Sequence, residues 1–161
     1  MRLGRSSGTA VPPSPLFIVR PGRFFLFMKT ILLIDNGPES SGLADVLKGF
    51  GYEVIASRDG LSALSLIREG APIDLVITDY PLTGMDGLEF LASLRKLAPA
   101  VPSVMLTAYG SVETYLKAYS LGVFEYVNKP VTTKELGRIV KTALNGARAF
   151  EKTNRATQNV L

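Results

Sequence analysis

Four reactive side chains of this sequence each follow a short apolar run, where a buried strand would end. Asp35 follows the first run, Asp79 the third and Thr107 the fourth, and Lys129 follows the fifth. A carboxylate can act as a nucleophile and form an aspartyl phosphate. That reaction needs positive charge on the phosphoryl oxygens, which a divalent metal and a lysine supply. Two carboxylates, a hydroxyl and an amine therefore indicate phosphoryl transfer, if the fold brings them together.

The apolar runs before these side chains indicate buried parallel strands, because they are short and rich in Ile, Leu and Val. They span residues 31–34, 53–56, 75–78, 103–106 and 125–127. Between them, apolar residues recur at helical spacing. In the second helix this stripe includes Leu61 and Leu64. Gly51 and Gly70 are expected to end the first two helices, and Thr132 with Glu135 fits a capping box at the start of the fifth.

Five alternations of strand and helix predict an α/β fold, a doubly wound parallel sheet with helices on both faces. The crossovers should be right-handed. Because the strands are parallel, their carboxyl ends lie at one edge of the sheet, where such sheets bind their ligands. Asp35, Asn36, Asp79, Thr107 and Lys129 should therefore meet there. The acids and the amide offer the oxygen ligands that Mg²⁺ prefers. The alternative for Asn36 is that it caps the helix that follows.

Four stretches of sequence resemble the motifs of two-component response-regulator receiver domains, among them the chemotaxis receiver. They are residues 31–36, 74–87, 104–110 and 126–130. The resemblance extends over about residues 29–147 and is specific, because the motifs occur in the family's order and at its separations. It implies a flavodoxin-like sheet of five parallel strands in the order 2-1-3-4-5.

The resemblance also implies a role for each candidate residue. Asp79 is the expected phosphoacceptor. The expected ligands of Mg²⁺ are Asp35, Asn36, Asp79 and the backbone carbonyl of Pro81. The expected phosphoryl-binding and switch residues are Thr107, Ala108, Tyr126, Lys129 and Pro130. On phosphorylation Thr107 is expected to move toward the phosphoryl group and Tyr126 to turn from outside to inside. This change would repack the face made by the fourth helix, the fifth strand and the fifth helix. The Lys129–Pro130 peptide bond is expected to be cis.

Three departures from the family pattern modify these expectations. Asn36 stands where a second acid is usual, so Mg²⁺ binding should be weaker but not lost, since an amide still offers an oxygen. Thr83 stands where a proline is usual, so the loop after Asp79 should be slightly looser. Pro81 and Tyr109 occupy the two variable positions that tune dephosphorylation. Neither can orient a water well, so self-dephosphorylation should be slow.

The resemblance implies partners as well. A sensor histidine kinase or a histidine phosphotransfer protein would supply the phosphoryl group, in the cytoplasm. A downstream protein, or an output domain of its own if the chain is truncated, would respond to it. A homodimer through the fourth helix, fifth strand and fifth helix is also expected. The alternative is a receiver-like interaction module that does not use phosphate, suggested by Asn36 and the altered loop after Asp79.

Composition excludes several other classes of function. The chain has no cysteine and no histidine, which removes disulfides, thiolate metal sites and the usual general base. An enzyme acting on an external substrate is disfavoured, because no phosphate-cradling glycine loop or nucleophile elbow is present. The net charge of +4 comes from four arginines in residues 1–27, while residues 28–161 carry 14 basic and 14 acidic side chains. Direct nucleic-acid binding is therefore not expected.

The charge and composition also suggest a division of the chain. Residues 1–27 are expected to be a disordered or non-native extension, with a membrane-interface anchor as the alternative reading. Residues 28–148 are expected to form the receiver domain, and residues 149–161 a polar tail or linker. The apolar stretches are too short for a membrane-spanning helix.

Overall fold

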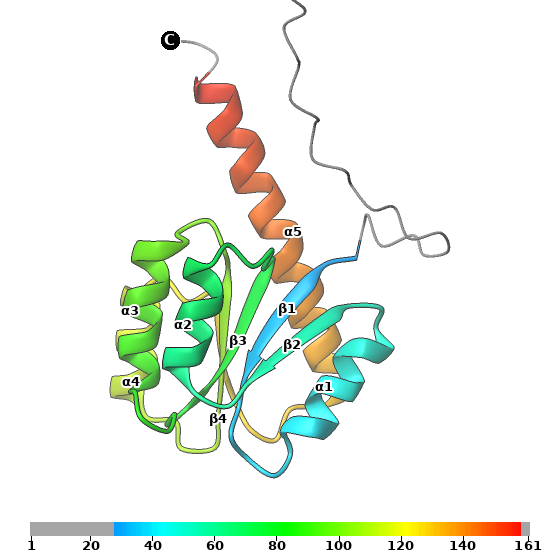
Figure 1. The fold of residues 1–161 in the computed structure, drawn as a ribbon, viewed down its shortest axis with the longest axis vertical. Helices are drawn as coiled ribbons and strands as arrows, with labels where there is room; N and C mark the ends of the chain where they lie inside the picture. The colour runs from blue at the N-terminus through cyan, green and yellow to red at the C-terminus, as the bar shows by residue number, and fades with distance from the viewer. Residues whose placement is uncertain (1–27, 159–161) are drawn as a thin grey trace, which may run out of the picture.

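A computed structural model describes residues 28–158, with side chains as far as residue 147. The expectations for residues 1–27 lie outside the described part. Strands and helices alternate along the chain (Figure 1). The strands are β1 (Thr30–Ile34), β2 (Glu53–Ser57), β3 (Leu75–Tyr80), β4 (Ser103–Thr107) and β5 (Glu125–Asn128). The helices are α1 (Ser40–Gly49), α2 (Gly60–Arg68), α3 (Gly87–Leu97), α4 (Val112–Ser120) and α5 (Thr133–Gln158).

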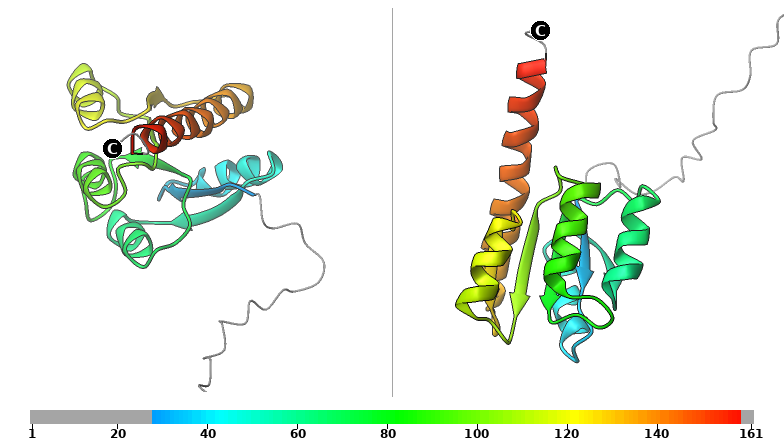
Figure 2. Two further views of the ribbon diagram at one scale, coloured as in Figure 1. Left: turned by 90° about the horizontal axis from the view of Figure 1, so that it is seen from above. Right: turned by 90° about the vertical axis from the view of Figure 1, so that its left-hand side faces the viewer.

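The strands form one parallel sheet in the order β2-β1-β3-β4-β5, which confirms the expected topology. Side chains of successive strand residues point to opposite faces of the sheet, so a strand covered on both faces is apolar throughout. In β1, Ile31 and Leu33 pack in one cluster with α1 and α5, whereas Leu32 and Ile34 pack in another with α2 and α3. Figure 2 shows these helices on the two sides of the sheet.

The helix ends follow from local residue chemistry. Asp59, Asp86 and Ser111 accept a backbone N–H in the first turns of α2, α3 and α4. Gly51 and Gly70 follow α1 and α2 with φ of 89° and 81°, a backbone region that favours glycine. The expected box at the start of α5 is half present among the described contacts, where the Glu135 N–H donates to Thr132 Oγ1 at 3.2 Å.

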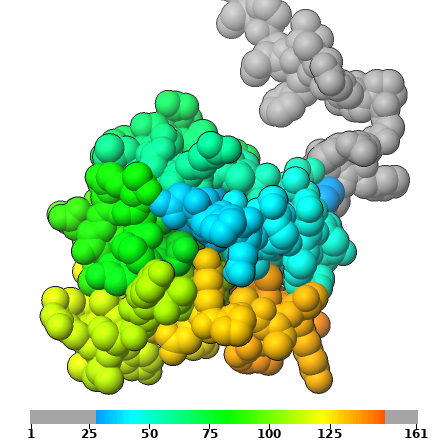
Figure 3. All heavy atoms as spheres, turned by 90° about the horizontal axis from the view of Figure 1, so that it is seen from below, coloured from blue at the N-terminus to red at the C-terminus, as the bar shows by residue number. Residues whose placement is uncertain are grey.

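The carboxyl ends of the strands lie at one edge of the sheet, at the bottom of Figure 1. Figure 3 looks onto this edge and shows the blue, green, yellow-green and orange segments of the chain meeting there. At the opposite edge α5 projects well beyond the sheet (Figures 1 and 2), and it continues through most of the expected polar tail. No helix in the described range is both long and apolar enough to cross a membrane.

The apolar stripe expected for α2 is wrong at one position. Leu64 is 1% exposed in the core, but Leu61, in the first turn of the helix, is 56% exposed at the outer margin of the stripe. Truncating Leu64 to Ala should therefore lower the free energy of unfolding by about 2–5 kcal/mol, through lost burial and the cavity left behind.

Urea unfolding of the two truncations on the same helix tests this difference. Leu61→Ala is the matched control and should change the free energy of unfolding by less than about 0.5 kcal/mol. Similar losses for Leu61→Ala and Leu64→Ala would contradict the burial described for α2.

Candidate functional site

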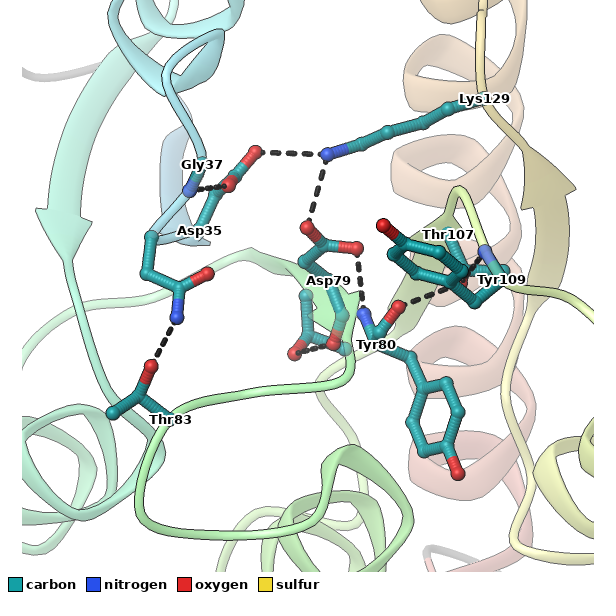
Figure 4. A network of polar contacts seen from close by, with 10 residues as sticks. Asp35, Gly37, Asp79, Tyr80, Thr83, Thr107, Tyr109 and Lys129 are labelled. Carbon is teal, nitrogen blue, oxygen red and sulfur yellow. Dashed lines mark hydrogen bonds and ion pairs between the residues drawn. The ribbon is translucent and has the colours of Figure 1, made fainter.

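The ammonium group of Lys129 joins two carboxylates at the carboxyl edge of the sheet. Its Nζ donates to Asp35 Oδ2 at 3.1 Å and to Asp79 Oδ2 at 3.0 Å. Figure 4 shows the lysine entering from the upper right, with its nitrogen between the two carboxylates. The three side chains are only 2%, 15% and 16% exposed for Asp35, Asp79 and Lys129. These charged groups are thus largely shielded from water, and they connect the ends of β1, β3 and β5.

Backbone groups hold the other carboxylate oxygens. The Gly37 N–H donates to Asp35 Oδ1 at 2.6 Å, and the Tyr80 N–H donates to Asp79 Oδ1 at 2.6 Å (Figure 4). Asp79 is the fifth residue of β3 and so lies within the strand, whereas the apolar run predicted a strand that ends at residue 78. Each acid therefore has one oxygen fixed by its own loop or strand, and one that contacts the lysine.

The environment of Lys129 favours its charged form. Burial alone opposes the charge, but hydrogen bonds from the ammonium to Asp79 and Asp35 outweigh it and raise the pKa of Lys129 above its ordinary value. A backbone bond from the Lys129 N–H to the Thr107 carbonyl, at 2.7 Å, fixes where the side chain begins. The lysine is thus held as a cation between the two acids.

Thr107 lies at the end of β4 but bonds away from the acids. Its hydroxyl donates to the Tyr80 carbonyl at 2.6 Å and accepts the Tyr109 N–H at 3.0 Å (Figure 4). The pairing of β3 with β4 places Tyr80 opposite Thr107, which explains the first bond. The hydroxyl therefore links β3 to the loop after β4 in this structure.

Tyr126 differs from the expected outward-facing position. Its ring is 9% exposed and packs with Leu91 and Met105 in the cluster between the sheet and α3–α4. The hydroxyl lies 3.0 Å from Thr114 Oγ1, which also belongs to the cap of α4. The ring is thus already inside in this structure, held by this cluster and by the contact with Thr114.

Asn36 does not cap the following helix, so the alternative reading of this residue is wrong. The N-cap of α1 is Glu39, which makes no side-chain cap bond. Asn36 Nδ2 donates instead to Thr83 Oγ1, in the loop after β3 (Figure 4). This contact ties together two loops where a looser loop was expected. The bond between Asn36 and Thr83 was missed in the sequence, because residues that far apart give no spacing signal.

A cavity of about 580 Å³ opens beside the carboxylate of Asp79. Tyr109, which lines it, is 74% exposed. The expected site residues at its wall are Asn36, Asp79, Pro81, Ala108, Tyr109, Lys129 and Pro130. The Lys129–Pro130 peptide bond is cis as expected, and the Tyr80–Pro81 bond is cis as well.

The donors at and next to this cavity suit Mg²⁺. Asp79 offers a carboxylate, Asn36 an amide oxygen and Pro81 a backbone carbonyl at its wall. Asp35 does not line the cavity, but its carboxylate shares the Lys129 ammonium with Asp79. Mg²⁺ takes oxygen ligands while keeping several waters. In the described part of the chain, no cluster of three or more acids, histidines or cysteines could hold a metal. The expected ligands thus include two acids and one amide, because Asn36 stands in place of the second acid.

A family model for the response regulator receiver domain matches residues 31–141, well over half of the chain. The chain belongs to the response regulator receiver domain family. This family serves two-component signalling rather than the conversion of an external substrate. Response regulators interact with sensor kinases, and receiver domains generally bind Mg²⁺ at their phosphorylation site. The resemblance seen in the sequence is confirmed.

Relatives of the receiver domain include longer regulatory proteins. The transcriptional regulatory protein ZraR of Klebsiella oxytoca is 34% identical over 122 residues, which are 75% of this chain and 27% of ZraR. The nitrogen assimilation regulatory protein NtrX of Azorhizobium caulinodans is 36% identical over 121 residues, which are 73% and 26% of the two chains. The chain thus spans about a quarter of the length of these relatives.

Solved structures agree with the fold. A CheY-like receiver domain protein from Methanospirillum hungatei matches with a TM-score of 0.73 and 28% identity, over 76% of this chain and 98% of that one. NtrX from Brucella abortus matches with a TM-score of 0.73 and 29% identity, over 81% of this chain and 30% of that one. The match covers nearly the entire length of the first structure, a receiver domain, so the fold described here is that of a receiver domain.

Replacing Lys129 by Met should lower the free energy of unfolding in Mg²⁺-free neutral solution by about 2–3 kcal/mol. The two acids then face each other without a cation. The expected loss is no larger than that for breaking a fully buried ion pair, because the site keeps some solvent exposure. Mg²⁺ should restore part of the loss by binding the freed carboxylates. Urea unfolding with and without Mg²⁺ measures both effects, with the surface variant Lys141→Met as control.

The pH range of this stabilisation follows from the raised pKa of Lys129. A pKa raised by folding stabilises the fold fully below the ordinary value of 10.5, and the stabilisation disappears as the pH rises through the folded-state pKa. The difference between wild type and Lys129→Met should thus be present at neutral pH and shrink as the pH rises into the strongly alkaline range. A difference that already disappears near neutral pH would contradict an ammonium held between the acids.

Proposed function

We propose that this receiver domain accepts a phosphoryl group on the carboxylate of Asp79 and works as a phosphorylation-dependent switch. The observation that carries the proposal is the position of Lys129 Nζ, 3.0 Å from Asp79 Oδ2 and 3.1 Å from Asp35 Oδ2. The cavity beside Asp79 gives a phosphoryl donor access to this carboxylate. A nucleophile, a cation and an opening therefore lie together.

In the proposed transfer, one oxygen of the Asp79 carboxylate attacks the phosphorus of the donor. A new phosphorus–oxygen bond forms, the bond from phosphorus to the donor breaks, and its electron pair leaves with the donor. Lys129 moves its charge from the carboxylates to a phosphoryl oxygen, a charge-assisted contact. Mg²⁺, held by Asp35, Asn36, Asp79 and Pro81, would supply further positive charge for the transferred oxygens.

The proposed switch begins at Thr107. A phosphoryl group adds close to two negative charges beside Asp79, and it attracts a hydroxyl that now donates to the Tyr80 carbonyl. Turning Thr107 toward the phosphoryl group would break that bond and free the Tyr109 N–H, so the loop between β4 and α4 would rearrange. Moving a switch from mostly off to mostly on needs roughly 5 kcal/mol. A few charge-assisted hydrogen bonds of about 1.5–3 kcal/mol each suffice.

Tyr126 carries this change to the surface in the proposed mechanism. Its hydroxyl contacts Thr114 in the cap of α4, and its ring meets the ring of Tyr115 edge to face at 5.6 Å. A shift of the loop before α4 would thus change the face formed by α4, β5 and α5. The exposed apolar side chains on α4 favour this face for a protein partner or a homodimer. They are Val112, Tyr115, Leu116 and Tyr119.

The proposal includes partners on both sides of the switch. A sensor histidine kinase or histidine phosphotransfer protein would be the donor, since response regulators work with sensor kinases. The two relatives named above are regulatory proteins, and the matched part of this chain covers only about a quarter of each. We therefore propose a protein target or a linked output domain as the receiver of the signal, rather than a nucleic acid bound by the receiver itself.

Acetyl phosphate with Mg²⁺ tests the proposed phosphorylation directly. Intact mass should show the gain of one phosphoryl group, and the gain should be absent from Asp79→Asn because an amide cannot be the nucleophile. Asp45→Asn, an exposed acid on α1, is the matched control and should be phosphorylated like wild type. No gain in wild type would favour the interaction module that does not use phosphate.

Tyr109 should lengthen the life of the phosphorylated state. Its exposed ring lines the cavity next to Asp79 and offers no carboxylate or amide that could orient an attacking water. Tyr109→Glu should speed dephosphorylation by roughly tenfold or more, measured as loss of the phosphoryl mass after removal of acetyl phosphate. Tyr109→Phe keeps the ring and should behave like wild type. Equal lifetimes for Tyr109→Glu and wild type would disprove this role.

A further inference from the structure

Two departures from the family pattern meet in space. Asn36 replaces an acid after β1 and Thr83 replaces a proline after β3, and the amide Nδ2 of Asn36 donates to the Thr83 hydroxyl oxygen. A proline at position 83 has no hydroxyl and could not make this contact. The two positions are 47 residues apart, yet both line the cavity at Asp79. The two substitutions are thus physically coupled at the site.

The direction of this hydrogen bond decides what Asn36 can offer to a cation. An amide presents an oxygen that can bind a metal and a nitrogen that carries two N–H donors and cannot. Unlike a carboxylate, it binds a cation from one of its two ends only. Because the nitrogen donates to Thr83, the oxygen is the end of the amide that remains for a cation in the cavity, which Asn36 lines. A free amide that rotated would present its N–H groups to the cation for part of the time.

We propose that Thr83 is a positioning residue for the metal site, which orients the Asn36 amide so that its oxygen faces the cation. The inference rests on the proposed function, since it concerns the Mg²⁺ of the same site. Outer-shell partners of metal ligands typically change metal affinity by about 10–100-fold. Both side chains here are exposed to solvent, so we expect an effect at the low end of that range.

A double-mutant cycle of Mg²⁺ affinity tests the inference on the full chain. Thr83→Val keeps the shape but removes the hydroxyl, and should weaken Mg²⁺ binding by roughly tenfold. The same change in the Asn36→Asp background should have less than about a twofold effect, because a carboxylate presents an oxygen in either orientation. Thr83→Ser should keep wild-type affinity. Thr142→Val, an exposed threonine that donates to the Arg138 carbonyl within α5, is the matched control.

Two readouts make the cycle independent of phosphorylation. Mg²⁺ affinity is measured by competition against Mn²⁺, whose binding is followed by the electron paramagnetic resonance spectrum of the free ion. Nuclear magnetic resonance of the ¹⁵N-labelled metal-free protein follows the side-chain NH₂ signals of Asn36, which are identified by their loss in Asn36→Asp. These signals should shift in Thr83→Val and stay in place in Thr142→Val, since only the first change removes the acceptor.

Several results would overturn the inference. Unchanged affinity in Thr83→Val, or an equal loss in both backgrounds, would mean that Thr83 does not act through Asn36. A higher affinity would mean that the amide oxygen, not the nitrogen, faces Thr83. If wild type binds Mg²⁺ and is phosphorylated on Asp79 while Thr83→Val behaves identically, only this inference falls. If wild type neither binds Mg²⁺ nor takes a phosphoryl group, the proposed function falls with it.

Discussion

The bridge that Lys129 forms between Asp35 and Asp79 is the interaction on which the carboxyl edge of this receiver domain depends. It joins side chains from the ends of β1, β3 and β5, so all three strands must pair in register before it can form. Two negative charges and one positive charge leave a net negative charge on this group. This net negative charge attracts a divalent cation. When no cation is bound, the lysine reduces the repulsion between the two acids.

The remaining strand of the site, β4, takes part through hydrogen bonds rather than charge. Thr107 donates to the Tyr80 carbonyl and accepts from the Tyr109 N–H, which joins the strand that bears Asp79 to the loop before α4. The Thr107 carbonyl also accepts the Lys129 N–H. Thr107 thus contacts the backbone of Lys129 and of Tyr80, the residue after Asp79. In the proposed switch, a change at Asp79 would reach the α4 surface through this residue.

The sequence was enough to predict the fold and the charged centre, because both depend on strong local signals. Apolar runs bounded by Asp35, Asp79 and Lys129 mark buried parallel strands, and parallel strands end at one edge. The exposed side of α2 was mistaken at Leu61, since a helical stripe leaves its outer margin undefined. The burial of Tyr126 was also missed, because the packing between β5 and α4 decides it and no residue pattern encodes that packing.

The contact between Asn36 and Thr83 shows why the finest level of the site escapes sequence reasoning. Each residue taken alone suggested a weaker feature: an acid lost beside the metal, and a proline lost from a loop. Only the conformation of two loops, at positions 47 residues apart in the chain, makes the two changes partners. An amide must be oriented to present its single oxygen to a cation, whereas a carboxylate presents an oxygen in either orientation. A hydroxyl beside Asn36 can therefore affect metal binding in a way that it would not beside an acid. In this proposal, Asn36 and Thr83 therefore act together at the metal site, and neither departure from the family pattern is understood without the other.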